Sequence, residues 1–266
     1  MKVVILTSTS LRHKYIANKV AEKLSVELII TEKKSPKIEE TKTYDEETQL
    51  FIKNHFDQRL ESEKVFFGGF KKFPSESKFL EVEHNQINSL AVFDEVKKIN
   101  PEIILLFGTS IIKKPLLDSF EGKIINLHLG LSPYYKGSAT NLFPVLYNEL
   151  ECIGATIHLA TNQVDQGNII AQIRPDILLE DSLHDIGNRV IFKSGEVLPT
   201  IIKLYAENKV KLTKQTEIGR ICRIKDLTPN VLREIYFNFN NGLKKEYLLN
   251  KIEKQILKPI CNLDII

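Results

Sequence analysis

The fold is decided by the stretch KVVILTSTSLRHKYIANKVAEKLSVELII, residues 2–30. Residues 2–7 and 26–30 are short apolar runs, typical of strands buried in a sheet. Between them, residues 12–24 carry apolar side chains every three or four positions, which is the spacing of an amphipathic helix. A strand, a helix and a second strand in this order predict two parallel strands joined by a helical crossover.

The rest of the chain continues this alternation after a charged interval. Residues 31–80 predict an exposed linker, a helix near 45–62 and a mobile loop at 66–77. Downstream we predict strands at 102–108, 123–128, 153–160 and 168–173, and helices at 88–98, 139–149, 181–207, 229–238 and 242–257. The prediction is therefore a Rossmann-like, doubly wound α/β domain with a mostly parallel sheet over residues 1–178. A linking helix and a small, mainly helical region follow over residues 179–266.

Composition and charge are ordinary for a globular protein. The chain has 266 residues, of which 42% are hydrophobic and 27% charged, with a formal net charge of +3. No apolar run approaches the ~18 residues of a membrane span, and the N-terminus lacks the apolar core of a signal peptide, so we expect a cytoplasmic protein without a membrane segment. Three widely spaced cysteines predict reduced thiols, and no spacing typical of metal ligands occurs.

Two polar residues end the predicted strand at 123–128. Asn126 and His128 are two positions apart, so both side chains point to the same face of the strand. In parallel α/β sheets, ligands bind at the carboxyl ends of the strands. We therefore expect the amide and the imidazole to project into one crevice. Each residue alone has a structural alternative, namely capping of the next loop or a satisfied histidine in the core.

A second segment, GATIHLATNQVDQGNIIAQ at residues 154–172, predicts a hairpin with Asp165 at its tip. Asp and Gly are also common turn residues for backbone reasons alone, which is the alternative for this position. Together, Asn126, His128 and Asp165 would form an acid–base site with an amide donor. Neighbouring Asp165 would orient His128 and favour its protonated form. The chain has no P-loop, no GxSxG and no GxGxxG after its first strand.

The two segments NLHLGLSPYYKG and GATIHLATNQVDQGNII resemble the formyltransferases that use 10-formyltetrahydrofolate. These enzymes include glycinamide ribonucleotide formyltransferase, methionyl-tRNA formyltransferase and the sugar N-formyltransferases. The resemblance implies that Asn126 holds the formyl oxygen and that His128 stabilises the same oxygen or moves protons. It implies that Asp165 orients His128 and assists proton transfer toward the leaving N10. By the same similarity, the residues expected to bind the folate co-substrate are Phe107, Ser110, Ile112, Thr161, Asn162 and Asp165.

The acceptor amine is inferred from features of individual family members that this chain lacks. A glycine-rich phosphate loop after the first strand is absent, which argues against glycinamide ribonucleotide, and the modestly basic, helical C-terminal region argues against tRNA. The similarity is greatest to sugar N-formyltransferases, so we expect a nucleotide-linked amino sugar in surface polysaccharide synthesis. Candidate acceptor-binding residues are Arg12, His13, Tyr135, Lys136 and Gly137, although Arg12 and His13 could equally face solvent and the tyrosine could pack its loop.

Transfer to methionyl-tRNA or to glycinamide ribonucleotide remains the alternative within the family, and two functions other than transfer also remain open. A hydrolase with the same site would release formate from the folate donor. A folate- or nucleotide-binding module would bind without transferring the formyl group. The apolar stripe of LKKEYLLNKIEKQILKPI, residues 243–260, could form a homodimer contact or pack on its own domain.

Overall fold

The computed structural model describes residues 1–33 and 44–262. Its strands are β1 Lys2–Thr7, β2 Ser25–Glu32, β3 Lys78–Val82, β4 Ile103–Leu106, β5 Ile124–His128, β6 Tyr135–Gly137, β7 Ala155–Leu159, β8 Ile169–Ile173 and β9 Arg220–Cys222. Its α-helices are α1 Leu11–Ala21, α2 Glu46–Phe67, α3 Leu90–Ile99, α4 Leu116–Ser119, α5 Phe143–Leu146, α6 Leu183–Ala206, α7 Pro229–Asn238, α8 Lys244–Leu249 and α9 Lys251–Leu257. Short helical segments of other types are η2 Leu150–Cys152, η3 Ile224–Asp226 and η4 Phe239–Leu243.

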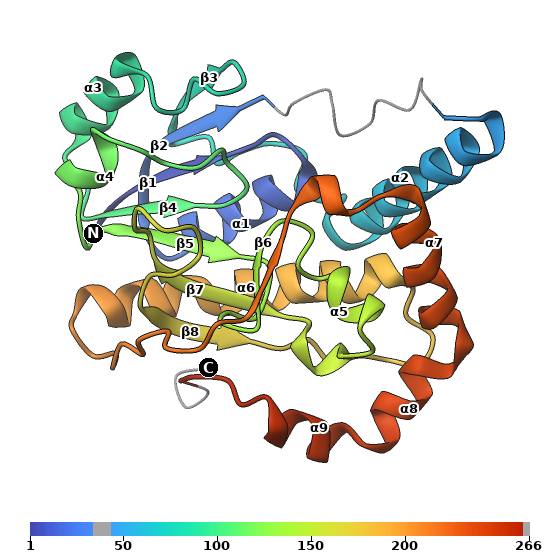
Figure 1. Ribbon diagram of the computed structural model, residues 1–266. Coiled ribbons are helices and arrows are strands. Elements are labelled where there is room, and N and C mark those ends of the chain that lie inside the picture. Colours follow the sequence, from blue (N-terminus) through green and yellow to red (C-terminus); the bar gives the residue numbers. More distant parts are fainter. Residues whose placement is uncertain (34–43, 263–266) are drawn as a thin grey trace.

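Seven strands form the main sheet, in the order β3-β2-β1-β4-β5-β7-β8 (Figure 1). The first five strands in that order are parallel, whereas β7 runs antiparallel to β5 and to β8. The chain moves outward from β1 to β3, returns to β4 beside β1, and then moves the other way. The order therefore reverses between β1 and β4, which is where doubly wound sheets bind ligands. The expected fold class is confirmed.

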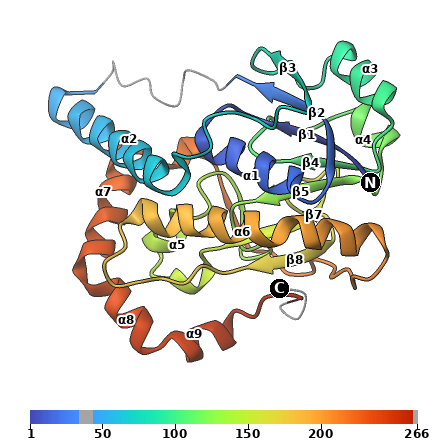
Figure 2. The same cartoon turned by 180° about the vertical axis from the view of Figure 1, so that it is seen from behind.

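Alternating side chains of β1 explain the two layers of helices. Val3 and Ile5 belong to the apolar core beneath α1 and α6, whereas Val4 and Leu6 belong to the core beneath α3 and α4. Successive residues of a strand point to opposite faces, so a strand with apolar residues at every position needs cover on both sides. Figure 2 shows α1 and α6 lying across one face of the sheet.

Several predicted elements differ from the structure. A strand, β3, was not expected in the charged interval, and the predicted linker at 34–43 lies outside the described residues. The helix predicted at 139–149 is wrong, because only α5 forms there, and Asn148 ends the segment with a φ of 58°. The helix predicted at 242–257 is interrupted by the non-helical Asn250, which separates α8 from α9, and Gly242, at a φ of 91°, is not helical at its predicted start.

The C-terminal region packs against the main domain. Strand β9 pairs with β6 in a two-stranded parallel sheet, so residues near 220 lie beside the loop that follows β5 (Figure 1). Helix α7 lies beside α2, and both views agree on this (Figures 1 and 2). Within the described residues, no helix is both long enough and apolar enough to cross a membrane. The domain boundary at 178 stays a prediction.

Candidate active site

The carboxyl ends of β1, β4 and β5 open into a cavity of about 1080 Å³. Asn126 and His128 line it, as the two-residue spacing predicts. On the antiparallel neighbour β7, His158 pairs in register with Asn126 and also lines the cavity. A third polar side chain therefore comes from the strand beside β5, and sequence reasoning assigned it no role.

Asp165 reaches the same point from the loop between β7 and β8. Its Oδ2 lies 3.4 Å from Nδ1 of His128, and its Oδ1 lies 3.4 Å from Nε2 of His158. Oδ1 also accepts a hydrogen bond from Nδ2 of Asn126 at 3.3 Å, and Oδ2 accepts one from the backbone N–H of Gly137 at 2.9 Å. The structure thus brings the three predicted catalytic residues together around one carboxylate.

The loop that carries Asp165 is held by backbone contacts. Nε2 of Gln215 donates to the carbonyl oxygens of Asp165 and Gly167, at 2.9 and 2.8 Å. A Cβ atom at Gly167 would lie 1.7 Å from the carbonyl oxygen of Leu159, so only glycine fits there. Asp165 itself has a φ of 52°, a left-handed conformation that Asp tolerates better than most residues. These constraints fix the direction in which the carboxylate points.

Burial and the neighbouring charges have opposite effects on the pKa values of Asp165 and His128. Burial would raise the pKa of Asp165, but the hydrogen bond from His158, the charges of His128 and His158, and the N–H of Gly137 outweigh it and lower the pKa to about 2. Burial lowers the pKa of His128 below its ordinary value, although the charge of Asp165 and the hydrogen bond to the carbonyl oxygen of Tyr135 act to raise it. Asp165 favours the protonated form of His128, as expected, but the desolvation of the buried imidazole outweighs this effect. The site holds an ionised Asp165 beside a neutral His128.

Both ring nitrogens of His128 face acceptors. Nε2 lies 3.3 Å from the carbonyl oxygen of Tyr135, and Nδ1 lies 3.4 Å from Asp165. A neutral imidazole has one N–H, whereas an imidazolium has two and would satisfy both acceptors. His128 is therefore neutral at rest but surrounded by groups that stabilise it once it takes a proton.

His158 has a defined orientation as well. Its Nδ1 donates to the carbonyl oxygen of Leu159 at 2.8 Å, so Nε2 is the nitrogen that faces the site. That Nε2 lies 3.1 Å from Nδ2 of Asn126 and 3.4 Å from Oδ1 of Asp165. The motif G-x-T-x-H contains this histidine on the cavity face of β7, and its cross-strand position opposite Asn126 is the signal that could have identified it.

The predicted co-substrate residues mostly lie on the cavity wall. Phe107, Ser110, Ile112 and Thr161 line the cavity with Asp165, whereas Asn162 is not among the lining residues. The backbone N–H of Ser110 donates to Oε2 of the buried Glu32 at 2.7 Å, which holds the loop after β4 in place.

The predicted acceptor residues divide into two groups. Arg12, His13 and Gly137 line the cavity, whereas Tyr135 and Lys136 do not. The hydroxyl of Tyr135 donates to Glu149, and Lys136 is buried on β6.

Part of the cavity wall comes from α2, the start of α6 and the η3–α7 segment, where the sequence analysis predicted no functional residue. The polar residues that line the cavity there are His55, Arg59, His184 and Lys225. No group of metal-ligating side chains occurs within residues 1–33 and 44–262.

Comparisons with known proteins agree with this geometry. A family model described as formyl transferase matches residues 1–202. Bifunctional polymyxin resistance protein ArnA from Wigglesworthia glossinidia brevipalpis is 30% identical over 167 residues, which cover 60% of this chain and 24% of that protein, so the chain spans about a quarter of that relative. Methionyl-tRNA formyltransferase from Finegoldia magna is 26% identical over 228 residues, or 83% of this chain and 73% of that protein.

A solved structure of a sugar N-formyltransferase from Shewanella sp. FDAARGOS_354 has the same fold. It superposes with a TM-score of 0.57 at 15% identity, covering 90% of this chain and 87% of that one. The match to the family model extends over well more than half of the chain. The chain therefore belongs to the formyl transferase family, whose members use 10-formyltetrahydrofolate as co-substrate.

Proposed function

We propose that this protein transfers the formyl group of 10-formyltetrahydrofolate to the primary amine of a nucleotide-linked amino sugar. The observation that carries formyl transfer is the convergence of Asn126, His128 and Asp165 in one cavity at the end of β5. A nucleotide sugar is supported by the size of the cavity, by the helical C-terminal region, and by the fold shared with a sugar N-formyltransferase. The reaction would take place in the cytoplasm, as a step toward surface polysaccharide.

In the proposed mechanism the acceptor nitrogen forms a bond to the formyl carbon, and negative charge develops on the formyl oxygen. Asn126 donates an amide N–H to that oxygen, leaving its other N–H for Asp165. Neutral His128 accepts the proton that the attacking amine loses, and ionised Asp165 stabilises the resulting imidazolium. The bond between the formyl carbon and N10 then breaks, and His128 returns the proton to N10.

The low pKa of Asp165 fits a supporting role. A carboxylate that stays ionised accepts hydrogen bonds throughout the reaction and does not store the proton itself. The neutral resting state of His128 fits a general base, because only an unprotonated imidazole can take a proton from the amine.

The function is tested by incubating the purified protein with 10-formyltetrahydrofolate and a panel of acceptors. The panel contains nucleotide-linked amino sugars, glycinamide ribonucleotide and charged initiator tRNA, with a reaction lacking any acceptor. Mass spectrometry should find one formyl group added to an amino sugar. Formylation of only the ribonucleotide or the tRNA would overturn the sugar acceptor. Formate release without an acceptor would indicate a hydrolase, and folate binding without any transfer would indicate a binding module.

A homodimer is also part of this proposal. Exposed apolar side chains gather on α8 and α9: Leu249, Ile252, Ile256 and Leu257. Light scattering of the full chain at micromolar concentration should give twice the mass of 30.5 kDa, and a monomer at all concentrations would contradict the dimer.

A further inference from the structure

Strand β8 contains one polar side chain, that of Gln172, in an otherwise apolar sequence, and this side chain is 1% exposed. Register pairing places Gln172 beside Thr156 of β7, which in turn pairs with His128 of β5. Paired residues of neighbouring strands point to the same face, so the three side chains form a row across the sheet. A buried amide in such a row needs hydrogen-bond partners, because an unpaired polar group in the core is costly.

The side chains of Gln172 and Thr156 hold the turn that follows β5. Nε2 of Gln172 donates to the carbonyl oxygen of Ser132 at 2.5 Å and to the hydroxyl of Thr156 at 3.2 Å. That hydroxyl donates to the carbonyl oxygen of Gly130 at 2.6 Å and accepts from the N–H of Ser132 at 2.9 Å. The turn begins the segment of residues 129–138, which we call the β5 loop.

The β5 loop supplies two backbone groups to the catalytic residues. The carbonyl oxygen of Tyr135 lies 3.3 Å from Nε2 of His128, and the N–H of Gly137 donates to Oδ2 of Asp165 at 2.9 Å. The N–H of Tyr135 donates to the carbonyl oxygen of Leu131 at 2.9 Å, which connects these groups to the turn. A displacement of the turn would therefore move the partners of both His128 and Asp165.

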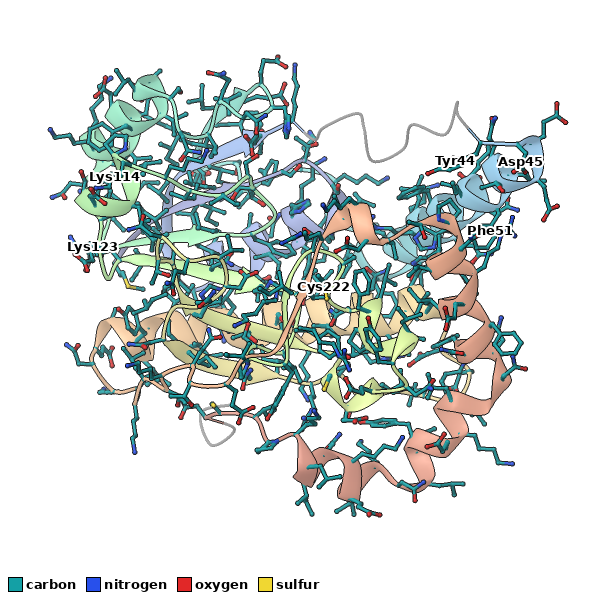
Figure 3. The ribbon with its side chains drawn as sticks, in the orientation of Figure 1. Tyr44, Asp45, Phe51, Lys114, Lys123 and Cys222 are labelled. Carbon is teal, nitrogen blue, oxygen red and sulfur yellow. The ribbon has the colours of Figure 1, made fainter. Side chains whose placement is uncertain are left out.

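The other end of the β5 loop is held by β9. Gly137 pairs in register with Cys222, which Figure 3 labels near the centre of the molecule. The N–H of Ser138 donates to the carbonyl oxygen of Cys222 at 2.9 Å, and the N–H of Arg220 donates to that of Tyr134 at 2.8 Å. The β5 loop is thus held at one end by β7 and β8 and at the other by β9.

Residues 258–262, which we call the strap, extend the row of side chains beyond β8. The N–H of Cys261 donates to Oε1 of Gln172 at 3.0 Å, and its carbonyl oxygen accepts from the backbone N–H of Gln172 at 3.2 Å. Nδ2 of Asn262 donates to the carbonyl oxygen of Ile170 at 2.6 Å. The strap therefore lies beside β8 (Figure 1), and it occupies the remaining polar atom of the Gln172 amide.

The strap also contacts the β5 loop directly. The hydroxyl of Tyr134 donates to the carbonyl oxygen of Pro259 at 2.9 Å, and the ammonium group of Lys258 lies 5.1 Å from the centroid of the same ring. The strap thus reaches the β5 loop in two places, through Tyr134 and through Gln172.

We propose that Gln172 is a positioning residue for formyl transfer, and that the strap acts through it to hold the β5 loop against His128 and Asp165. This inference rests on the proposed function, since those two residues are the ones assigned to the transfer. Gln172 is not among the described residues that line the cavity, so its effect on the reaction is indirect. A misplacement of about 1 Å at catalytic groups can lower a rate by about 10²-fold.

Amide hydrogen exchange of the full chain tests this support without turnover. Gln172→Met keeps the length of the side chain but removes its amide donors and its acceptor. The amides of the β5 loop should then exchange about 10- to 100-fold faster, because the loop opens more often, whereas those of β1 and β4 should keep their wild-type rates. Gln255→Met is the matched control, because Gln255 is a partly buried glutamine of α9 whose amide donates to Tyr247.

A second variant tests the strap itself. Asn262→Gly removes the hydrogen bonds from the side chain to the carbonyl oxygens of Ile170 and Lys211, and glycine tolerates the φ of 56° at this position. It should also speed exchange in the β5 loop, although less than Gln172→Met does. Asn208→Gly makes the same change at an exposed asparagine with a φ of 55°, and it should leave exchange in the loop as in the wild type.

Kinetics separate positioning from binding. With the acceptor that the panel identifies, Gln172→Met should lower kcat by about 10²-fold with little change in the folate KM, and it should bind 5-formyltetrahydrofolate as the wild type does. If Gln172→Met does not fold, Asn262→Gly carries both measurements, with a smaller decrease in kcat.

Two results would overturn the inference while formyl transfer still stands. One is wild-type exchange in the β5 loop of both variants, and the other is faster exchange with an unchanged kcat. Absence of formyl transfer by the wild type would instead overturn the proposed function, and the exchange rates would still decide whether Gln172 and the strap hold the loop.

Discussion

Asp165 is an anion that four neighbouring groups stabilise. The amide of Asn126, the N–H of Gly137 and the two imidazoles all face its carboxylate. Such an arrangement keeps the carboxylate ionised although it is 8% exposed, and the ionised form is what raises the basicity of His128. In the proposed mechanism, Asp165 therefore acts on the reaction through His128.

Replacing this carboxylate should change the histidine in a measurable direction. Because Asp165 raises the pKa of His128 against the effect of burial, Asp165→Asn should lower that pKa further. The imidazole becomes a weaker base and turnover should fall by about 10²- to 10⁴-fold, the usual contribution of a general base. Nitrogen NMR of labelled histidine checks the titration, with His84, an exposed residue, as internal reference. An unchanged or raised pKa of His128 would contradict the assigned role.

Asn126 provides a second test at the same scale. Asn126→Ala removes the amide donor from the formyl oxygen, and losing one such donor typically costs about 10²- to 10³-fold in kcat. The folate KM should change little, because the donor acts mainly in the transition state. Steady-state kinetics with saturating acceptor measures both quantities. Asn54→Ala, an exposed position on α2 outside the cavity wall, is the matched control, and equal kcat in the two variants would refute the role of Asn126.

At the scale of elements, the strands could be predicted from the sequence. The buried contacts of helix α2 could be recognised only in the folded structure. Most residues of strands β1, β4 and β5 are buried and apolar, so the sequence of these strands carries a strong signal. Helix α2 was expected near its true position, but its buried residues include His55, Ser62 and Glu63, which form no apolar stripe. Polar burial depends on partners elsewhere in the chain, such as Arg12 for Glu63, and no local pattern reveals them. For the same reason, the sequence did not reveal that residues of α2 and of the C-terminal region line the cavity.

The contact between α2 and α7 should be sensitive to acid. In the folded protein, burial lowers the pKa of His55 to about 3 and of His184 to about 4, below the ordinary 6.5. The unfolded chain therefore binds more protons below pH 6.5, so the free energy of unfolding should decrease as pH falls from 6.5 toward 4. Each histidine should contribute about 2 kcal/mol of this loss between pH 7 and pH 5, at 1.36 kcal/mol per pKa unit.

Urea unfolding at both pH values measures this effect. His55→Gln should remove about 2 kcal/mol of the pH-dependent change, whatever its effect on stability at pH 7, because His184 and the buried His128 contribute the rest. His84→Gln, on the exposed loop after β3, should leave the change as in the wild type. A His55→Gln protein with the full wild-type dependence on pH would show that this histidine is not responsible.

For the whole molecule, the order of strands explains why a site predicted from two segments came together. Asn126 and Asp165 are 39 positions apart, yet β7 pairs with β5 and returns its loop to the end of that strand. The paired segments are close in sequence and carry a recognisable motif, so this part of the site could be predicted. Another part of the cavity wall combines residues from 44–59 with residues from 184–225, and only the complete fold brings these segments together.

The division of the chain into residues 1–178 and 179–266 is best tested on the molecule as a whole. Helix α6 lies beyond that boundary but covers the same face of the sheet as α1, and seven of its apolar side chains belong to the main core: Leu183, Ile186, Val190, Ile191, Leu198, Ile201 and Ile202. Burial of each contributes about 1.5–3 kcal/mol. Their combined loss is comparable to the ~5–15 kcal/mol by which a domain is stable.

A chain ending at residue 178 should therefore fail to fold cooperatively, and it should aggregate because one face of its sheet is uncovered. Circular dichroism during heating and size-exclusion chromatography measure the two effects. As a control, the full chain is cut by a protease at a site inserted after Asn208, beyond the end of α6, and it should keep its fold because both fragments retain their contacts. Cooperative unfolding of the isolated 1–178 fragment would establish the boundary at 178, whereas its collapse would move α6 into the catalytic domain.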